Sequence, residues 1–381
     1  MNKLKVMVII GTRPEAIKMA SIIRVLKQNQ TRIKVIVVTT AQHRDLVDSV
    51  LRLFAIKPQV DCNIMQKQQT LSQITIRALS KLSHIIDTVN PQVVLVQGDT
   101  TSAFAGALAA FYHKVPIGHV EAGLRSFDKY NPYPEEINRK FISAIADWHF
   151  APTKTAKLNL IKENITPSKI FVTGNTGIDA LLYFAKQNYI PNIPELKKVD
   201  WTKRIILVET HRRENWGQPM RNICSSLKDI IERNQDLELI FPCHPNPQVY
   251  RTVNSMLGKK DRMHIFVATK YSDFVQLMKK AYLILSDSGG IQEEAPVLGK
   301  PVLVLRKVTE RPEAVRAGAI RVVGTNIDSI ISNTQLLLDY PTKYRNMAKN
   351  TYIYGDGKAA SRIINILFYH LGLKKSLPQE F

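Results

Sequence analysis

Cysteine is scarce in this sequence. The three cysteines in 381 residues, Cys62, Cys224 and Cys243, lie far apart and form no C-x-x-C pair. An odd number of widely spaced cysteines argues against a disulfide framework and fits a reducing compartment. We therefore expect three free thiols in a cytoplasmic protein.

Long hydrophobic runs are also missing. The apolar stretch at the start of the chain is interrupted by Arg13 and Pro14, far short of the apolar region of a signal peptide. The most apolar longer segment, 101–112, is too short to span a bilayer and is predicted to form a buried helix. The sequence thus predicts neither secretion nor membrane insertion.

Several motifs that identify common enzyme classes are absent. No G-x-G-x-x-G follows the first apolar run, and residues 11–18 lack the G-K-S/T of a P-loop, which argues against a dinucleotide cofactor and Walker-type ATP binding. No P-C-x-x-C completes a deaminase zinc site, and no G-x-S-x-G marks a serine hydrolase. We expect no cofactor and no catalytic metal.

Charge is abundant but not concentrated. The formal net charge is +21, from 53 Lys and Arg against 32 Asp and Glu, and the basic residues are scattered without a dense block. This distribution disfavours nucleic acid as a partner and is compatible with a small acidic substrate.

Short β-branched apolar runs alternate with helical spacing along the whole chain, which predicts parallel sheets covered on both faces. The first set of runs spans 4–10, 33–40, 92–99, 115–123 and 170–175, and the second spans 204–209, 237–245, 263–268, 282–290, 301–306 and 319–324. We predict an α/β protein of two Rossmann-like doubly wound domains, joined through the polar segment 188–203. The first domain is expected at 1–173 with a C-terminal helix at 361–376 packing back on it, and the second at 174–360.

The stretch SDSGGIQEEAPVLGKP, residues 286–301, indicates an anion site. A strand followed by small residues and a helix start presents free N–H groups and the positive end of the helix dipole to a phosphate. A carboxylate one turn into the helix is able to accept hydrogen bonds from a ribose diol. Together these features suggest a nucleotide, although an ordinary strand-to-helix turn with dipole-complementing acids fits this stretch alone equally well.

Nine motifs in order give a more specific prediction. They lie at 11–20, 40–51, 97–102, 118–126, 133–139, 211–215, 286–306, 309–315 and 354–363. Their sum resembles the bacterial non-hydrolysing UDP-N-acetylglucosamine 2-epimerases over nearly the whole chain. The resemblance implies a GT-B-like fold with the active site in a cleft between the two domains.

The resemblance also implies a set of UDP-binding residues. Ser288, Gly289 and Gly290 would hold the diphosphate, and Glu294 the ribose hydroxyls. The further positions that match the family around the diphosphate, sugar and uracil are Arg13, Lys18, His211, Arg213, His244, Phe274 and Arg311. For His244 a structural role fits as well as binding, Phe274 fits the core as well as the uracil side, and Arg311 fits an ion pair with a neighbouring acid as well as the nucleotide.

The chemistry implied by the resemblance requires carboxylates. The hydrogen at C2 of the sugar is not acidic, so the family eliminates UDP across C1 and C2, forms 2-acetamidoglucal and adds UDP back after protonation from the other face. The candidate proton carriers are Asp99, Glu121 and Glu135, with His211 as a further polar partner. The product would supply N-acetylmannosamine for surface polysaccharide.

Each candidate carboxylate also has a structural interpretation. Taken alone, Asp99 fits the N-cap of the helix at 101–112. Glu121 fits a buried acid satisfied by backbone groups. Glu135, together with Glu136, fits the first turn of a helix after Pro134.

A second, regulatory site is implied by other matching positions. Gln42, His43, Arg44 and Gln69 match residues that bind an activating UDP-N-acetylglucosamine in non-hydrolysing members. Lys67 and Gln68 stand where several relatives have Pro-Gly, a departure from the family pattern in this loop. The resemblance further implies a homodimer.

Three other functions compete with this interpretation. A hydrolysing epimerase shares the elimination step but releases N-acetylmannosamine and UDP. A GT-B UDP-sugar glycosyltransferase would explain the 286–301 motif equally well but not the three carboxylates. A catalytically inactive UDP-sugar-binding protein or a basic nucleic-acid-binding protein is disfavoured by the retained carboxylates and the scattered charge.

Overall fold

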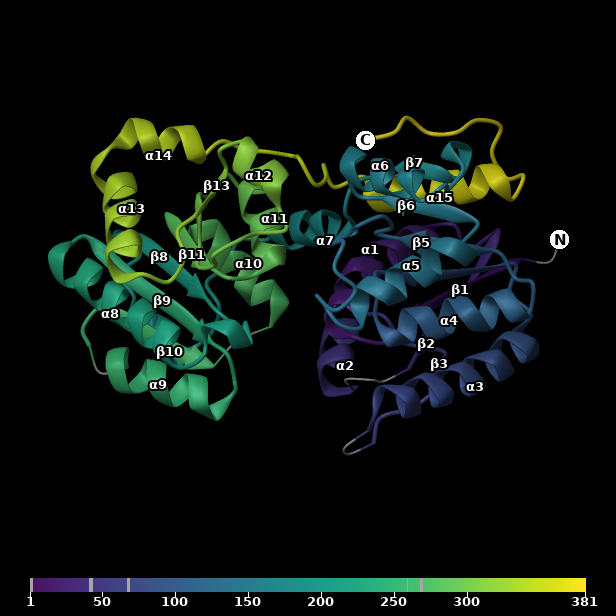
Figure 1. Ribbon diagram of the computed structural model, residues 1–381, viewed down its shortest axis with the longest axis horizontal. Helices are drawn as coiled ribbons and strands as arrows, with labels where there is room; N and C mark the ends of the chain where they lie inside the picture. The colour runs from purple at the N-terminus through teal and green to yellow at the C-terminus, as the bar shows by residue number, and fades with distance from the viewer. Residues whose placement is uncertain (1–2, 41–43, 67–68, 259, 268–269) are drawn as a thin grey trace. The chain divides into compact units, whose positions relative to one another are not determined.

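The computed structural model describes residues 3–40, 44–66, 69–258, 260–267 and 270–381. The chain divides into two compact units, which we call unit 1 (Met1–Leu182 with Tyr354–Phe381) and unit 2 (Tyr183–Ile353). Each unit contains one parallel sheet with helices packed on it (Figure 1). This is the predicted pair of Rossmann-like domains.

Unit 1 contains a seven-stranded sheet in the order β3-β2-β1-β4-β5-β6-β7. Its strands are β1 (Leu4–Ile10), β2 (Ile33–Thr39), β3 (Val60–Asp61), β4 (Val93–Gln97), β5 (Ile117–Val120), β6 (Trp148–Ala151) and β7 (Ile170–Val172). Its helices are α1 (Arg13–Gln28), α2 (Arg44–Leu53), α3 (Leu71–Val89), α4 (Thr101–Tyr112), α5 (Glu135–Ile145), α6 (Lys154–Lys162), α7 (Thr176–Ala185) and α15 (Ala359–His370). The strand order reverses between β1 and β4, and ligands of doubly wound sheets bind outside the carboxyl ends of the strands at such a point.

Unit 2 contains a six-stranded sheet in the order β10-β9-β8-β11-β12-β13. Its strands are β8 (Arg204–Glu209), β9 (Leu237–Cys243), β10 (Met263–Val267), β11 (Leu283–Ser286), β12 (Val302–Val304) and β13 (Ile320–Val322). Its helices are α8 (Gln218–Arg233), α9 (Pro247–Leu257), α10 (Tyr271–Lys280), α11 (Gly289–Val297), α12 (Pro312–Arg316), α13 (Ile327–Asp339) and α14 (Pro341–Met347). Here the order reverses between β8 and β11, so the turn after β11 lies at the corresponding position.

The sequence pattern did not reveal β6. Its four residues include His149 at the second position, and this histidine interrupts what would otherwise be an apolar run. The strand forms because it pairs on both sides, with Gly118–Val120 of β5 and with Ile170–Val172 of β7. Tertiary pairing therefore overrides a weak local signal.

The boundary between the units lies within α7, later than the predicted boundary at residue 173. The carboxylate of Asp179 in α7 accepts hydrogen bonds from the backbone N–H groups of Ala359 (3.2 Å) and Ala360 (2.9 Å) at the start of α15. The backbone N–H of Asn175 also donates to the carbonyl of Tyr354 at 2.6 Å. These contacts hold most of α7, and the segment from Tyr354, in unit 1, where α15 packs against α1.

Two further predictions concern burial. The apolar segment 101–112 forms α4, most of which is buried, as predicted. The three cysteines are buried and free. Within the described ranges, no helix combines the length and apolar character needed to cross a membrane.

Candidate functional site

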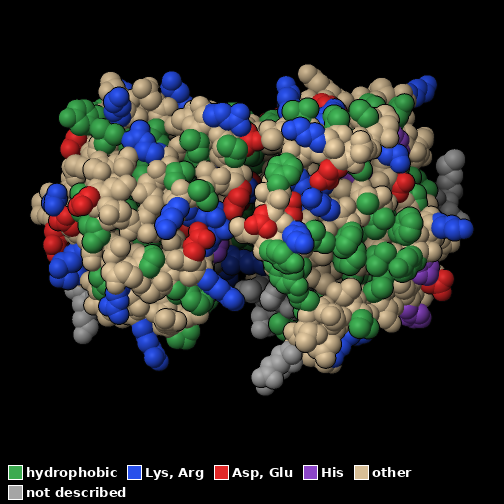
Figure 2. Space-filling model, in the orientation of Figure 1, with side chains coloured by type: hydrophobic (Ala, Val, Ile, Leu, Met, Phe, Trp, Pro, Cys, Tyr) green, Lys and Arg blue, Asp and Glu red, His purple; other side chains and the backbone are tan. Residues whose placement is uncertain are grey.

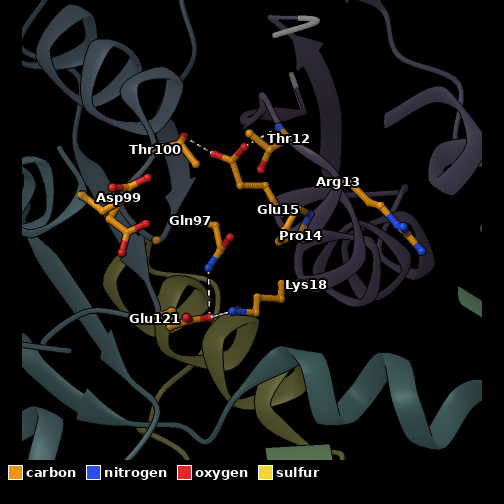
Figure 3. A pocket seen from close by; sticks show the side chains of 11 residues that line it. Thr12, Arg13, Pro14, Glu15, Lys18, Gln97, Asp99, Thr100 and Glu121 are labelled. Carbon is orange, nitrogen blue, oxygen red and sulfur yellow. Dashed lines mark hydrogen bonds and ion pairs between the residues drawn. The ribbon is translucent and has the colours of Figure 1, made fainter. Parts of the chain in front are cut away.

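A pocket of about 480 Å³ lies at the carboxyl ends of β1, β4 and β5 in unit 1 (Figure 3). Its volume falls within the range of about 300–1,000 Å³ that is usual for small-molecule sites. It is lined by Thr12, Arg13, Pro14, Glu15, Lys18, Gln97, Gly98, Asp99, Thr100, Glu121 and Glu135. The three predicted carboxylates, and Arg13 and Lys18, the basic residues predicted to bind the substrate in this domain, therefore line one pocket.

Glu15 occupies the start of α1. Its carboxylate accepts hydrogen bonds from the backbone N–H groups of Gly11 (2.9 Å) and Thr12 (2.5 Å), and from the hydroxyl of Thr100 (2.7 Å; Figure 3). The last bond joins the turn after β1 to the turn after β4. Because a protein carboxylate already occupies this helix terminus, the terminus does not offer a phosphate site.

Burial raises the pKa of Glu15 from its ordinary value of 4.5 to about 7. The folded state therefore retains this proton up to about pH 7, whereas the unfolded chain releases it near 4.5. The stabilisation of the folded state by the protonated Glu15 is fully present below pH 4.5, the pKa in the unfolded chain. It decreases by about 1.4 kcal/mol per pH unit as the pH rises to about 7, the pKa in the folded state. We expect wild type to lose on the order of 3 kcal/mol more stability between pH 4.5 and 8 than Glu15→Gln.

Urea unfolding at pH 5 and pH 8 measures this difference. Glu232→Gln provides a matched control, because the Glu232 side chain is 54% exposed on α8. Equal pH dependence in wild type and Glu15→Gln would contradict the assignment.

Asp99 follows β4 through a tight turn. Gly98 has φ +68°, a left-handed conformation that glycine adopts without strain. The N-cap of α4 is Thr100, whose hydroxyl oxygen accepts from the backbone N–H of Ala103 at 3.0 Å. The interpretation of Asp99 as the N-cap is therefore wrong, since Thr100 satisfies the helix start.

The carboxylate of Asp99 faces the pocket and accepts a hydrogen bond from Arg139 Nη2 of α5. Burial raises the pKa of Asp99, Arg139 lowers it, and the neighbouring Glu121 raises it further. A carboxyl group with a raised pKa is suited to carrying a proton near neutral pH.

Glu121 lies directly after β5 and has φ +63°. Its carboxylate forms an ion pair with Lys18 of α1 and accepts from Gln97 Nε2 at 2.9 Å (Figure 3). The structural alternative, a buried acid satisfied by backbone groups, is wrong because both partners are side chains of the pocket.

The two acids at the start of α5 differ in their surroundings. Glu135 lines the pocket. Glu136 is fully buried and accepts from the backbone N–H groups of Ser126 (3.0 Å) and Phe127 (3.2 Å) and from Arg139 Nη1 (3.1 Å). Glu136 therefore holds the preceding loop, while Glu135 is available to a ligand in the pocket.

In unit 2, the predicted anion turn lies between β11 and α11. Ser288 is the N-cap and α11 begins at Gly289, with no acidic residue in its first turn. In the described part of the chain, a Cβ atom at Gly290 would meet only Ser288 Oγ, at 3.8 Å. In contrast to α1, this helix start carries no carboxylate of its own, so it is the better candidate for a diphosphate.

A hydrogen-bond network fixes His211 beside this turn. His211 Nδ1 donates to Glu209 Oε1 at 2.8 Å, and the His211 backbone N–H donates to Asp287 Oδ1 at 3.0 Å. The other oxygen of Asp287 accepts from Arg212 N (3.2 Å) and Asn215 Nδ2 (2.7 Å). The hydrogen bond to Glu209 raises the pKa of His211, which favours the imidazolium beside an anionic ligand.

Donor atoms of Glu209, His211 and Asp287 lie within 4.8 Å of one another, a spacing that suits a metal ion. However, both oxygens of Asp287 already accept from protein N–H groups, and Glu209 Oε2 accepts from Ser286 Oγ at 3.0 Å. These groups therefore have a structural function in orienting His211.

The remaining predicted residues of unit 2 lie on several elements. Glu294 of α11 accepts from the Tyr271 hydroxyl at 2.9 Å, and Phe274 is half-buried on α10. Arg213 lies over the Trp216 ring at 5.9 Å, and His244 Nδ1 accepts from Asn246 N at 3.1 Å.

Arg311 bonds to Glu293 Oε1 through Nε at 2.5 Å. Its Nη2 would also lie 3.6 Å from a Cβ at Gly289. Arg311 therefore makes the ion pair with a neighbouring acid that the sequence allowed, and it also lies beside the turn between β11 and α11.

Part of the predicted regulatory site falls outside the described residues. Gln42 and His43 lie outside them, as do Lys67 and Gln68, the two residues that depart from the family pattern. Arg44 is the first residue of α2, and Gln69 Nε2 donates to the carbonyl of Ile64 at 2.6 Å.

Sequence reasoning missed Glu15, which lines the pocket, and Arg139, which bonds to the pocket residue Asp99. Glu15 stands three residues after Thr12, the T-x-x-E spacing of a capping box, so a signal existed for its role at the helix start. Arg139 had no such signal, because its contact with Asp99 joins residues 40 positions apart.

Comparisons with known proteins show which family this geometry matches. A family model described as UDP-N-acetylglucosamine 2-epimerase matches residues 25–368. The UDP-N-acetylglucosamine 2-epimerase of Bacillus subtilis (strain 168) is 48% identical over 381 residues, which cover 100% of this chain and 99% of that protein.

Solved structures give the same result. The S. aureus MnaA co-structure with UDP superposes with a TM-score of 0.90 at 46% identity, covering 99% of this chain and 100% of that one. The UDP-GlcNAc 2-epimerase of Neisseria meningitidis bound to UDP-GlcNAc has a TM-score of 0.87 at 44% identity, covering 96% and 100%. The chain is thus similar to these epimerases over nearly its full length.

Proposed function

The chain belongs to the UDP-N-acetylglucosamine 2-epimerase family, and we propose that it interconverts UDP-N-acetylglucosamine and UDP-N-acetylmannosamine by elimination and re-addition of UDP. The observation that carries the proposal is the convergence of Asp99, Glu121 and Glu135 on one pocket. Inversion of the configuration at C2 requires one proton carrier on each face of the sugar. Carboxylates placed around one pocket supply such carriers.

We assign the sugar ring to unit 1. Asp99 and Glu121 are the proposed proton carriers, because their carboxylates line the same pocket and interact electrostatically. In the forward direction one carboxylate takes the C2 proton, the C1–O bond breaks and UDP leaves with the bonding electrons. A protonated group then delivers a proton to the opposite face of C2 as UDP re-forms the bond at C1.

We assign the uridine diphosphate to unit 2. The N-terminus of α11 and the raised pKa of His211 both favour negative charge at this position. Stabilising the diphosphate as it leaves lowers the barrier to elimination. Glu294 and Phe274 are the proposed ribose and uracil contacts, with Arg213, His244 and Arg311 around them, and Arg13 and Lys18 are the proposed unit 1 cations for the substrate.

Proton NMR in deuterated water tests the proposal. Purified protein with UDP-N-acetylglucosamine should form UDP-N-acetylmannosamine carrying deuterium at C2, with little free UDP. Accumulation of N-acetylmannosamine and UDP would indicate a hydrolysing enzyme instead. An unchanged sugar spectrum despite measurable UDP binding would contradict the epimerase mechanism.

We also propose that a second UDP-N-acetylglucosamine activates the reverse reaction through Gln42, His43, Arg44 and Gln69. The same assay, started from pure UDP-N-acetylmannosamine, should show a lag that a trace of UDP-N-acetylglucosamine removes. A reaction without a lag, and unaffected by the trace, would contradict this site.

We propose a homodimer that forms through unit 1. Hydrophobic side chains are exposed over α3, α4 and α5 (Figure 2), among them Ile76 (66% exposed), Tyr112 (62%) and Phe141 (52%). A contiguous apolar surface of this kind is typical of an interface between copies. Sedimentation equilibrium should give twice the chain mass for wild type, and a monomer mass at micromolar concentration would contradict the dimer.

The last proposal concerns where the protein acts and what its product is used for. We propose that the protein acts in the cytoplasm, where its three free cysteines remain reduced, and that its product supplies N-acetylmannosamine for surface polysaccharide.

A further inference from the structure

His119 lies in β5, two residues before Glu121, and its side chain is completely buried. Its Nε2 lies 2.7 Å from the carbonyl oxygen of Gly98. A carbonyl oxygen only accepts, so Nε2 carries the hydrogen and donates it. Burial lowers the pKa of His119 to about 3, so the ring is neutral and Nδ1 carries no hydrogen.

Gly98 is the residue immediately before Asp99, and both of its backbone groups bond to β5. Its N–H donates to the carbonyl of Val120 at 2.9 Å, and its carbonyl accepts from His119. Gly98, which leads into Asp99, is therefore held through both of its peptide groups by residues that lead into Glu121. One further bond, from Gln97 to Glu121, joins the same two strand ends.

The hydrogen bond from Nε2 to Gly98 leaves the other ring nitrogen of His119 in the interior. The Nδ1 atom of His119 is buried without a hydrogen-bond partner in the part of the chain that is described. An unsatisfied buried polar atom typically costs about 1–3 kcal/mol. An apolar side chain would carry no such cost but would leave the Gly98 carbonyl without this donor.

We propose that His119 is a positioning residue of the reaction: by donating to the Gly98 carbonyl it fixes the position of the Asp99 carboxylate relative to that of Glu121. The inference rests on the proposed function, because the spacing of the two groups matters only if both exchange protons with the same sugar carbon. A misplacement of about 1 Å typically costs on the order of 10²-fold in rate.

The test compares two substitutions of nearly equal shape. His119→Gln retains an N–H donor at about the reach of Nε2, whereas His119→Met retains the volume but not the donor. The matched controls are His149→Gln and His149→Met, because His149 is buried directly opposite His119 on β6. Within the described residues His149 makes no hydrogen bond to the Gly98–Asp99 turn.

We expect His119→Met to lower kcat by about 10- to 100-fold with little change in KM, since the loss lies in the positioning of groups that act on C2. It should also release more 2-acetamidoglucal and UDP per turnover, because the re-protonation step loses its aligned donor. His119→Gln should recover most of the activity, and both His149 variants should retain it.

Three results would overturn the inference. The first is equal kcat in the Gln and Met variants of His119, and the second is an equal loss in the His149→Met control. The third is available even if His119→Met does not fold: nitrogen-15 NMR of wild type should show the Nε2–H tautomer without titration from pH 5 to 9, and an Nδ1–H tautomer would contradict the hydrogen bond. Wild-type epimerisation in the same assay separates failure of this inference from failure of the proposed function.

Discussion

Replacement of Asp99 by Asn is expected to lower kcat for epimerisation by about 10²- to 10⁴-fold, the usual contribution of a general acid or base. An amide has nearly the same shape as the carboxyl group and still accepts from Arg139 through its oxygen, but it neither takes nor gives a proton at C2. The affinity for UDP should remain unchanged, because the proposed diphosphate contacts lie in unit 2. Activity measurements together with calorimetric titration of UDP test both statements.

The same variant identifies the face of the sugar that Asp99 serves. If Asp99 removes the C2 proton of UDP-N-acetylglucosamine, Asp99→Asn should incorporate no deuterium from solvent into that substrate. If Asp99 protonates the other face, deuterium should enter UDP-N-acetylglucosamine while no epimer forms.

The control for this experiment is Asp261→Asn, because the Asp261 side chain is 97% exposed. It should keep full activity. Wild-type kcat in Asp99→Asn would exclude Asp99 as a proton carrier.

The second large effect is expected at the turn after β11. Gly290→Ala should weaken UDP binding by about 10- to 100-fold, equivalent to about 1.4–2.8 kcal/mol. Among the described residues the added methyl group would contact only Ser288 Oγ, at 3.8 Å, and the backbone of Gly290 is not in the left-handed region. Because the described residues leave this space open, the methyl group would meet the diphosphate at its proposed position.

Thermal unfolding of Gly290→Ala provides the control within the same variant. A Gly-to-Ala change at a compatible helical position typically stabilises a protein by about 0.4–1 kcal/mol, so the melting temperature without ligand should stay constant or rise. Weaker UDP binding with a lower melting temperature would indicate a damaged fold. Unchanged UDP affinity would contradict the assignment of the diphosphate to this turn.

Much of the fold was predictable because the signal is local. The apolar run at 4–10 and the helical spacing that follows it describe β1 and α1 without knowledge of any other segment. The turn at Ser288–Gly290 was predictable for the same reason, since small residues between a strand and a helix have a direct conformational meaning. β6 was missed because its pairing partners, not its own four residues, stabilise it.

The site was predictable in its members but not in its contacts. Family motifs selected Asp99, Glu121 and Glu135, and the structure places all three around one pocket of unit 1. Whether Asp99 or Thr100 caps α4 depended on which side chain reaches the Ala103 N–H, and two adjacent cap-forming residues cannot be distinguished by propensity.

The sequence by itself determined the alternation of strands and helices, the small-residue turn of unit 2 and the motif order that identifies the family, because each is a property of neighbouring residues. Only the tertiary structure decided that Glu15 accepts from Thr100, that Arg139 holds Asp99, and that His119 bonds to Gly98. These are side-chain contacts between segments 21 to 85 positions apart. Their energies depend on burial and on distances of about 3 Å, which exist only after the sheet has brought its strand ends together.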